Sequence, residues 1–337
     1  MRTDGAGMKT ELRRSKMDVS VIIVNYKTPE LCINAINSVF EKSVGVAYEI
    51  IVVDNASGDN SVEKISNVFG DRVKYIESDV NLGFGKANNL GIKQSTGEFV
   101  FLLNSDTLLR NNAIKILYDF LKFDETRGIA GGNLFNASGK PAHSYLREIP
   151  SVKNVKLPCL FTRLFRKLTF GKNNREFNAT GKPMRINGYI TGADMMIRRS
   201  ALEKSGLFDP DFFMYSEEVE LTYRIVKCGY SVWSVPSAEI THLEGGSFVD
   251  KRVNEQRERN MISGTCLLFE KIYGPDSVGR LLEVLKHNSG KRMRHYIATG
   301  AFGAIKRAKL IRTIVDEYAD AYKNGILLYR RQQGCER

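Results

Sequence analysis

An apolar run in this chain ends abruptly in three polar residues. In EFVFLLNSDTLL, residues 98–109, these are Asn104, Ser105 and Asp106. A continuous apolar strand suits the middle of a parallel sheet, and such sheets bind ligands at the carboxyl ends of their strands. An aspartate at that place is suited to a hard divalent cation, which prefers oxygen ligands. As an alternative, Asp106 only caps the following turn through its own side chain.

A second apolar run, in YEIIVVDNASGDNS, ends at Asp54 and Asn55. A carboxylate there can accept hydrogen bonds from the N–H groups of a nucleotide base. Capping is again the alternative for either acid alone. Because the carboxyl ends of parallel strands line one crevice, Asp54 and Asp106 together favour a ligand site.

The pattern around these two strand ends alternates between strands and helices, which predicts a doubly wound parallel sheet. Past residue 130 the alternation loosens, and after residue 247 the chain reads as helices. We expect strands at 19–26, 48–54, 73–78 and 98–106, and helices at 28–43, from 61 onward, at 86–95 and at 111–123.

Composition narrows the class of protein. The chain has 337 residues, of which 42% are hydrophobic and 26% charged, as in globular proteins. Its five cysteines form no CxxC pair, which favours reduced thiols over a disulfide framework. Residues 1–17 lack the apolar core of a signal peptide, and no stretch has the roughly 18 apolar residues of a membrane span. We therefore expect a cytoplasmic protein, either soluble or bound to a surface.

The formal net charge of +12 is unevenly distributed. From Arg280 onward there are 13 Lys and Arg against 5 Asp and Glu, and residues 151–175 are basic without any acid. Nucleic acid, anionic lipid and a phosphorylated substrate are all partners for such charge, but no nucleic-acid-binding module is recognisable. Bases around short apolar runs between Lys291 and Arg312 suit helices lying on anionic lipid. A helical bundle packed on the rest of the protein is the alternative.

The stretch NLGFGKANN, residues 81–89, partly matches the dinucleotide fingerprint GxGxxG. Gly83 and Gly85 fit its first two glycines, but Asn88 stands at the third. A lone partial match is weak evidence for a dinucleotide-dependent oxidoreductase. We interpret the stretch instead as a glycine turn that lets the backbone approach a nucleotide, with Lys86 and Asn88 near ribose or phosphate.

Five stretches in a fixed order resemble glycosyltransferase family 2, and in particular its rhamnosyltransferase-like branch. They are VSVIIVNYKTPELCINAINSV, EIIVVDNASGDNS, NLGFGKANNLGIKQSTGEFVFLLNSD, TGADMMIRRSALEKSGLFDPDFFMYSEEVELTYRIVKCGY and ITHLEGGS, within about residues 18–270. The resemblance implies a GT-A type fold with a Rossmann-like, mostly parallel sheet. It also implies inverting transfer from a nucleotide diphosphate sugar with Mg²⁺ or Mn²⁺. We expect a catalytic domain over 18–275, after a polar tail at 1–17 and before a helical basic extension at 276–337.

The resemblance assigns a nucleotide pocket and a metal site. Asp54 matches the acid that binds the base, and NSD stands where the family has its DxD-type metal motif. Asp106 is then the main metal ligand, with His242 near metal and diphosphate. The remaining residues expected around the nucleotide are Asn25, Tyr26, Asn55, Gly83, Lys86, Asn88, Asn104 and Ser105.

The resemblance also assigns catalytic acids. Asp194 matches an acid near the donor sugar and the acceptor. In SEEVEL, Glu218 takes the place of the catalytic base, but a Glu replaces the family's Asp there, so Glu217 remains an alternative. Without the resemblance, Glu217 and Glu218 read as a solvated helix face. Glu217 and Glu220 stand at helical spacing and could pair with Arg224.

Three residues are expected near the diphosphate. Gly246 and Ser247 follow His242 directly, and Arg259 matches an Arg-Asn pair of the branch. A surface ion pair between Arg259 and Glu255 is the alternative for that residue.

Donor and acceptor remain open at this level. An acid in the place of Asp54 can recognise the N3–H that uracil and thymine share, so a dTDP- or UDP-sugar is expected, with dTDP-rhamnose favoured by the branch. The acceptor is expected to be a glycan or lipid-linked glycan of bacterial cell-surface polysaccharide or O-antigen. We expect it to be reached from the cytoplasm, with peripheral binding at the inner face of the plasma membrane as the further option.

Two other functions stay in view. A sugar-1-phosphate nucleotidyltransferase would have a Gly-rich basic loop after the first strand, where this chain has NYKTPE. A non-catalytic nucleotide- or lipid-binding scaffold would lack the metal and base candidates.

Overall fold

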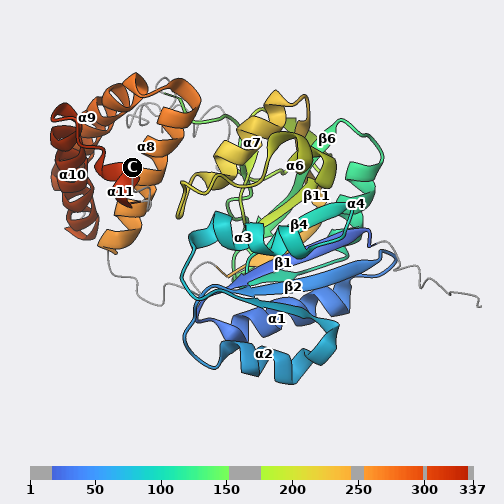
Figure 1. Cartoon of the computed structure of the whole chain (residues 1–337). Helices are drawn as coiled ribbons and strands as arrows, with labels where there is room; N and C mark the ends of the chain where they lie inside the picture. Colours follow the sequence, from blue (N-terminus) through green and yellow to red (C-terminus); the bar gives the residue numbers. More distant parts are fainter. Residues whose placement is uncertain (1–16, 152–175, 244–253, 299–301, 333–337) are drawn as a thin grey trace, which may run out of the picture.

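The computed structural model describes residues 17–151, 176–243, 254–298 and 302–332. Its centre is a nine-stranded sheet with helices on both faces (Figure 1). The predicted polar tail, apart from Met17, and nearly all of the basic stretch 151–175 lie outside these residues, as do Gly246 and Ser247.

The first half of the sheet is parallel and the second half is mixed. Four strands pair in parallel, in the order β3 (Lys74–Glu77), β2 (Tyr48–Asp54), β1 (Val19–Asn25) and β4 (Phe99–Leu103). The sheet continues through β10 (Asp194–Arg198), β6 (Arg127–Phe135), β11 (Ser231–His242) and β5 (Thr107–Leu109), while β8 (Met184–Ile186) pairs with β11. The mixture begins where β10 pairs antiparallel with β4. A separate pair, β7 (Tyr145–Leu146) and β9 (Tyr189–Ile190), lies beside this sheet.

Alternating side chains of the strands build one core on each face of the sheet. On β4, for example, Phe99 and Phe101 face one core and Val100 faces the other. The first core is covered by α1 (Pro29–Lys42), α2 (Ser61–Phe69) and α4 (Ala113–Lys122), and the second by α3 (Gly83–Gln94), α6 (Arg199–Ser205) and α7 (Glu217–Lys227). Strands buried on both faces explain the continuous apolar runs of the sequence.

The strand predicted at 98–106 ends earlier, at Leu103. The apolar residues that resume after Asp106 form their own short strand, β5, which pairs antiparallel with the end of β11. In this register Thr107 lies opposite His242. Two segments more than 130 residues apart therefore meet at the edge of the sheet.

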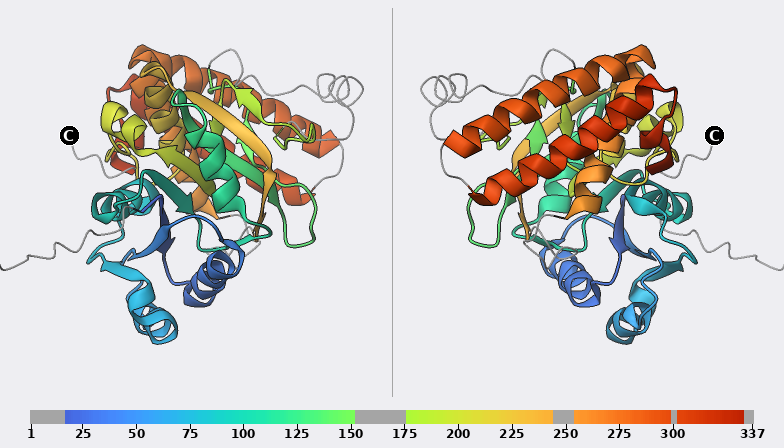
Figure 2. Two further views of the ribbon diagram at one scale, coloured as in Figure 1. Left: turned by 90° about the vertical axis from the view of Figure 1, so that its right-hand side faces the viewer. Right: turned by 90° about the vertical axis from the view of Figure 1, so that its left-hand side faces the viewer.

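The C-terminal helices form a bundle with its own core. It contains α8 (Glu255–Tyr273), α9 (Asp276–Ala298), α10 (Phe302–Lys323) and α11 (Leu328–Gln332). Figure 2 shows α9 and α10 side by side as a hairpin. Because α8 shares this core, the helical unit begins before the boundary predicted at 275. Among the described residues, no helix is long and apolar enough to cross a membrane.

A buried acid, Glu49, links the parallel strands at their amino ends, away from the polar carboxyl ends. Its carboxylate accepts hydrogen bonds from the Ser20 hydroxyl (2.7 Å), from the backbone and hydroxyl of Thr96 (2.7 Å each) and from Lys74 Nζ (2.6 Å). Burial by itself would raise the pKa of Glu49, but these donors outweigh it and lower the pKa to about 2 from an ordinary 4.5. The ionised carboxylate thus holds β1, β2, β3 and the turn before β4 in one network.

We predict that Glu49→Gln lowers the free energy of unfolding at pH 7 by up to about 3 kcal/mol, the linkage value of such a pKa shift. A carboxyl with a lowered pKa stabilises the fold above pH 4.5 and loses that contribution as the pH falls toward 2. Urea unfolding of parent and variant at pH 7 and pH 3 measures the effect. The variant should be the less stable protein at pH 7 and the difference should shrink at pH 3, whereas Glu30→Gln, in an exposed pair with Lys64, should change little. An equal difference at both pH values would contradict the assignment.

Candidate functional site

The ends of β1 and β2 lie side by side, because Asn25 and Asp54 are register partners. The Asp54 Oδ1 atom accepts hydrogen bonds from Asn25 Nδ2 (2.7 Å) and the Ser57 hydroxyl (2.6 Å), and its Oδ2 atom accepts one from the Ser57 backbone N–H (3.0 Å). Asp54 therefore caps the turn that follows it, as the alternative interpretation holds. A carboxylate offers about four acceptor positions, so one position on Oδ2 is left for a base.

The two loops after these strands adopt a backbone that few side chains favour. Lys27 has a φ of 59° and Ala56 a φ of 61°. The Ser57 hydroxyl joins the loops, since it also accepts a hydrogen bond from the Lys27 backbone N–H (2.9 Å). Tyr26 is exposed, and Lys27 Nζ lies 5.4 Å from the centre of its ring. Strained backbone that its surroundings hold in place is common at ligand sites.

The third loop, around Gly83, is tied to Asn55. The Asn55 amide donates to Asn81 Oδ1 (3.0 Å) and to the Gly83 carbonyl (3.2 Å), and its oxygen accepts from the Leu82 N–H (2.8 Å). Gly83 has a φ of 76°, and a Cβ atom there would lie 1.8 Å from the carbonyl oxygen of Phe213. The close approach at this glycine is to protein backbone, whereas the approach predicted from the sequence is to a nucleotide. Asn55 serves to hold this loop.

The other residues predicted in this region lie on α3, which begins at Gly83, three residues earlier than expected. Asn88 is buried and its amide donates to the Phe84 carbonyl within the helix (3.0 Å). Lys86 is half-buried. Neither contact decides their predicted role near ribose or phosphate.

The residues predicted as metal ligands are neighbours. His242 Nε2 lies 3.2 Å from Asp106 Oδ1, and both side chains retain some exposure. Ser105 Oγ lies 3.3 Å from the Thr28 hydroxyl, and the Asn104 N–H donates to the Ala193 carbonyl (3.1 Å). The NSD triplet is therefore fixed between the first loop and the start of β10.

Asp106 and His242 fit a divalent cation that is also bound by the phosphates of a substrate. Among the described residues, no cluster of three or more His, Cys, Asp and Glu side chains is arranged to enclose a metal. Mg²⁺ is commonly held by one or two carboxylates together with substrate phosphates rather than by a cage of protein groups. One carboxylate and one imidazole at the mouth of a site match that arrangement and also suit Mn²⁺.

Asp194, predicted near the donor sugar and the acceptor, lies inside the sheet and is 0% exposed. Its Oδ2 atom accepts a hydrogen bond from the Gly132 N–H (2.7 Å), while Oδ1 has no partner among the described residues. Burial raises the pKa of Asp194 well above its ordinary value, against the smaller opposing effect of the Gly132 N–H. These surroundings disfavour the charged form of the side chain.

Glu217 and Glu218, called here the acid pair, form the first turn of α7. Glu217 is 3% exposed, and its Oε2 atom has no partner in the described part of the chain. Burial, followed by the charge of Glu218, raises the pKa of Glu217, and burial also raises that of Glu218. The solvated helix face is therefore wrong for Glu217. The pair that this interpretation expected between Glu220 and Arg224 is present, with two contacts of 2.7 Å.

With this geometry in place, the comparison with family models is decisive. Residues 20–206, more than half of the chain, match the model described as glycosyl transferase family 2. The chain belongs to glycosyltransferase family 2. The resemblance seen in the sequence is thereby confirmed.

Curated relatives of this family 2 chain act on glycans. A low-salt glycan biosynthesis hexosyltransferase of Haloferax volcanii is 32% identical over 213 residues, which cover 61% of each chain. An N-acetylglucosaminyl-diphospho-decaprenol L-rhamnosyltransferase of Mycobacterium tuberculosis is 26% identical over 206 residues, 57% of this chain and 66% of the relative. The chain thus spans about two thirds or less of the length of these relatives.

Solved structures confirm the GT-A fold. The mannosyltransferase of Pyrobaculum calidifontis, in complex with GDP-Man and Mn²⁺, superposes with a TM-score of 0.54 at 16% identity and covers 92% of this chain and 89% of that one. GalNAc-T7 with UDP, GalNAc and Mn²⁺ gives a TM-score of 0.53 at 17% identity over 76% of this chain and 48% of that one. At such identity the likeness concerns the fold and not the substrate.

For this family 2 chain the predicted diphosphate contacts are the least supported part of the site. Arg259 forms ion pairs of 2.9 Å with Glu255 and with Glu317, so the alternative surface pair is present and a second acid joins it. Both acids raise the pKa of Arg259, with Glu317 contributing most. The other two predicted contacts, Gly246 and Ser247, lie outside the described residues.

Four residues near the site were not predicted from the sequence. Tyr189 lies beside the acid pair, and its pKa is raised by burial and by the charges of Glu218, Glu176 and Glu217. His143 Nδ1 lies 2.8 Å from a Glu176 carboxylate oxygen, and its charge opposes the raised pKa of Glu218. Lys27 and Ser57, in the nucleotide loops, are the other two. Only Ser57 had a local signal, three residues after Asp54 in an Asx-turn position.

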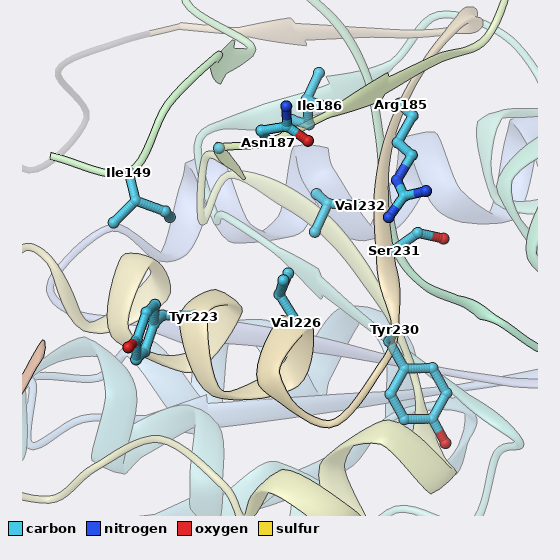
Figure 3. Close-up of a pocket in the computed structure, with 10 residues that line it drawn as sticks. Ile149, Arg185, Ile186, Asn187, Tyr223, Val226, Tyr230, Ser231 and Val232 are labelled. Atoms are coloured by element: carbon cyan, nitrogen blue, oxygen red, sulfur yellow. The ribbon is translucent and has the colours of Figure 1, made fainter.

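A separate hollow lies between α7, β8 and β11 (Figure 3). Tyr223 and Val226 reach it from α7, and Arg185 and Val232 from the two strands. The acid pair lies at the other end of α7, and none of the predicted site residues lines this hollow.

Proposed function

We propose that the chain is a metal-dependent, inverting glycosyltransferase that moves a sugar from a dTDP- or UDP-sugar to a glycan acceptor. The 3.2 Å approach of His242 to Asp106, at the same sheet edge as Asp54, is the observation that carries the proposal. Rhamnose is the proposed sugar and a lipid-linked precursor of a cell-surface polysaccharide or O-antigen the proposed acceptor. A relative named for L-rhamnose transfer to a decaprenol-linked sugar supports both.

The nucleotide would bind across the ends of β1 and β2. The acceptor position left on Asp54 Oδ2 suits the N3–H of uracil or thymine, and the exposed Tyr26 ring offers a face for stacking. The Lys27 ammonium beside that ring adds a positive charge near the phosphates. Ser57 holds both loops in this arrangement.

Asp106 and His242 would hold Mg²⁺ or Mn²⁺, which as a Lewis acid neutralises charge on the departing diphosphate. Glu218 would accept the proton of the attacking acceptor hydroxyl. Its raised pKa brings the carboxyl closer to neutral pH, where a general base works best. A single displacement at the anomeric carbon, with the base on the side opposite the leaving group, inverts that centre.

The two other functions have less support. The loop after β1 is short and lacks the glycines a nucleotidyltransferase would need to surround a triphosphate. A non-catalytic scaffold gives no reason for two adjacent carboxyls with raised pKa values, one buried and one half-buried, since such groups cluster at functional sites.

The hairpin of α9 and α10 is the proposed contact with an anionic membrane surface. Residues 284–315 contain eight Lys and Arg and no acid. The apolar faces of the helices pack in the bundle core, as the alternative interpretation expected. Three of these basic side chains form ion pairs within the bundle. Lys286 and Arg312 bind Asp316, and Arg307 binds Glu258. Four others are exposed and have no ion pair with a described residue, namely Lys291, Arg294, Lys306 and Lys309.

We predict that the protein releases nucleoside diphosphate from dTDP-rhamnose or a UDP-sugar only with Mg²⁺ or Mn²⁺, and that EDTA abolishes the release. Asp106→Asn should cut turnover at least about 10²-fold, since an amide holds a cation far less well. The variant should also lose the rise in melting temperature that Mn²⁺ with dTDP or UDP gives the parent. Asp59→Asn, at an exposed aspartate, is the matched control. Full activity in EDTA would overturn the metal assignment.

We predict that Glu218→Gln lowers kcat by about 10²–10⁴-fold with little change in the KM of the donor, because the amide keeps the shape and loses the proton affinity. Glu217→Gln should retain most of the activity. In the parent, a base with a raised pKa must lose its proton, so kcat should fall as the pH drops through a value above 4.5. An inactive Glu217→Gln beside an active Glu218→Gln would reverse the two roles.

We predict that the full chain sediments with vesicles containing phosphatidylserine, but not with neutral vesicles, at low salt. Each Lys or Arg near such a surface contributes about 1 kcal/mol, and salt screens the attraction. Changing Lys291, Arg294, Lys306 and Lys309 together to Gln should abolish binding without exposing the bundle core, as truncation would. The control changes four exposed lysines of the catalytic domain to Gln, namely Lys42, Lys93, Lys140 and Lys182. Equal loss in both variants would leave the hairpin as a structural bundle only.

A further inference from the structure

The turn before the acid pair has an unusual backbone. Tyr215 has a φ of 70° and Ser216 a φ of 72°, and neither is a glycine. Two consecutive left-handed residues with side chains are costly, and such a turn persists only where its surroundings enforce it. Since Ser216 immediately precedes α7, this turn sets the direction in which Glu217 and Glu218 enter the site.

Helix α8 presses directly on this turn. A Cβ atom at Gly264 would lie 2.4 Å from the carbonyl oxygen of Tyr215 and 3.2 Å from that of Met214. No other residue type fits there without a shift of backbone. Glycine is a poor helix former, and Gly264 stands in the middle of a 19-residue helix. The close approach of α8 to the turn explains why a glycine stands at this position.

The same helix holds the chain just before the turn. Lys271 Nζ binds Asp209 (2.9 Å) and Asp211 (2.5 Å). Phe212 and Val219, on either side of the turn, are buried in the core that α8 shares with the rest of the bundle. Residues 209–219 are therefore attached to α8 by charge, by apolar packing and by backbone contact.

Helix α3 holds the opposite side of this segment. The Phe84 N–H donates to the Phe213 carbonyl (3.0 Å), and the missing Cβ of Gly83 makes room for the same carbonyl. The turn is thus held between α3 and α8. Helix α3 begins in the third loop of the predicted nucleotide site, and α8 lies beyond residues 20–206 of the family match.

We propose that Gly264 is a positioning residue for the acid pair: α8, with its glycine against the strained turn, holds Glu217 and Glu218 in the geometry that transfer requires. This inference rests on the proposed function of the acid pair. It gives the C-terminal bundle a role in catalysis that does not depend on its charge.

The test compares Gly264→Ala with Gly279→Ala in the full chain. Gly279 is also a helical glycine of the bundle, but its Cβ would meet only the edge of the Tyr322 ring, at 3.0 Å. Both changes improve helix propensity equally, so they differ in the neighbour that must move. Hydrogen–deuterium exchange of residues 211–220 reports on the turn without any need for activity, and steady-state kinetics report on the acid pair.

Gly264→Ala should raise exchange in residues 211–220 and lower kcat by about 10²-fold, with the donor KM within twofold, since a displacement near 1 Å suffices for such a loss. Gly279→Ala should match the parent in both measurements. Lys271→Met releases Asp209 and Asp211 without adding bulk near the turn. It should raise the exchange and lower kcat by smaller amounts than Gly264→Ala does. This variant replaces Gly264→Ala in the test if Gly264→Ala does not fold.

Unchanged exchange in residues 211–220 in both Gly264→Ala and Lys271→Met would overturn the proposal, whatever the activity. Raised exchange with an unchanged kcat would show that the contact is structural and does not position the acid pair. If the parent itself transfers no sugar while exchange responds as expected, the proposed function fails and the grip of α8 on the turn stands.

Discussion

The antiparallel pairing of β5 with the end of β11 is the constraint on which the site depends. β5 has only three residues, yet its register with β11 places His242 next to Asp106. Without it, Asp106 would end a strand as a single carboxylate at the surface. With it, the Asp106 carboxylate and the His242 imidazole lie together at the edge of the sheet where β1 and β2 end in Asn25 and Asp54. Backbone hydrogen bonds of the sheet thus assemble side chains that are distant in the sequence.

The acids of this protein separate into two kinds according to what surrounds them. Glu49 is buried among donors, and its charge stabilises the fold. Asp194 and Glu217 are buried with few donors, so their charged forms are disfavoured. Burying a carboxyl with so few donors costs stability, and carboxyls of this kind are concentrated at functional sites. The same burial that costs stability also moves their pKa values toward neutrality.

The C-terminal bundle is joined to the rest of the protein through contacts next to the acid pair. Its helix α8 approaches the strained turn before α7 closely enough to exclude a side chain at Gly264. Its outer hairpin carries residues 284–315, a basic stretch without any acid. One unit thus faces the acid pair on its inner side and presents positive charge on its outer side.

The sequence by itself determined the parallel half of the sheet, because buried parallel strands leave continuous apolar runs between helical segments. It also determined the polar strand ends and the family. It did not determine the mixed second half, the separate strand β5, the partners of Asn55 or the second partner of Arg259, Glu317, since these depend on segments brought together only by folding. Burial of Glu217, the strain at Tyr215 and Ser216, and the approach of Gly264 were likewise decided by tertiary structure. In the sequence Glu217 reads as a surface residue, and only the packing of α7 against its neighbours removes it from water.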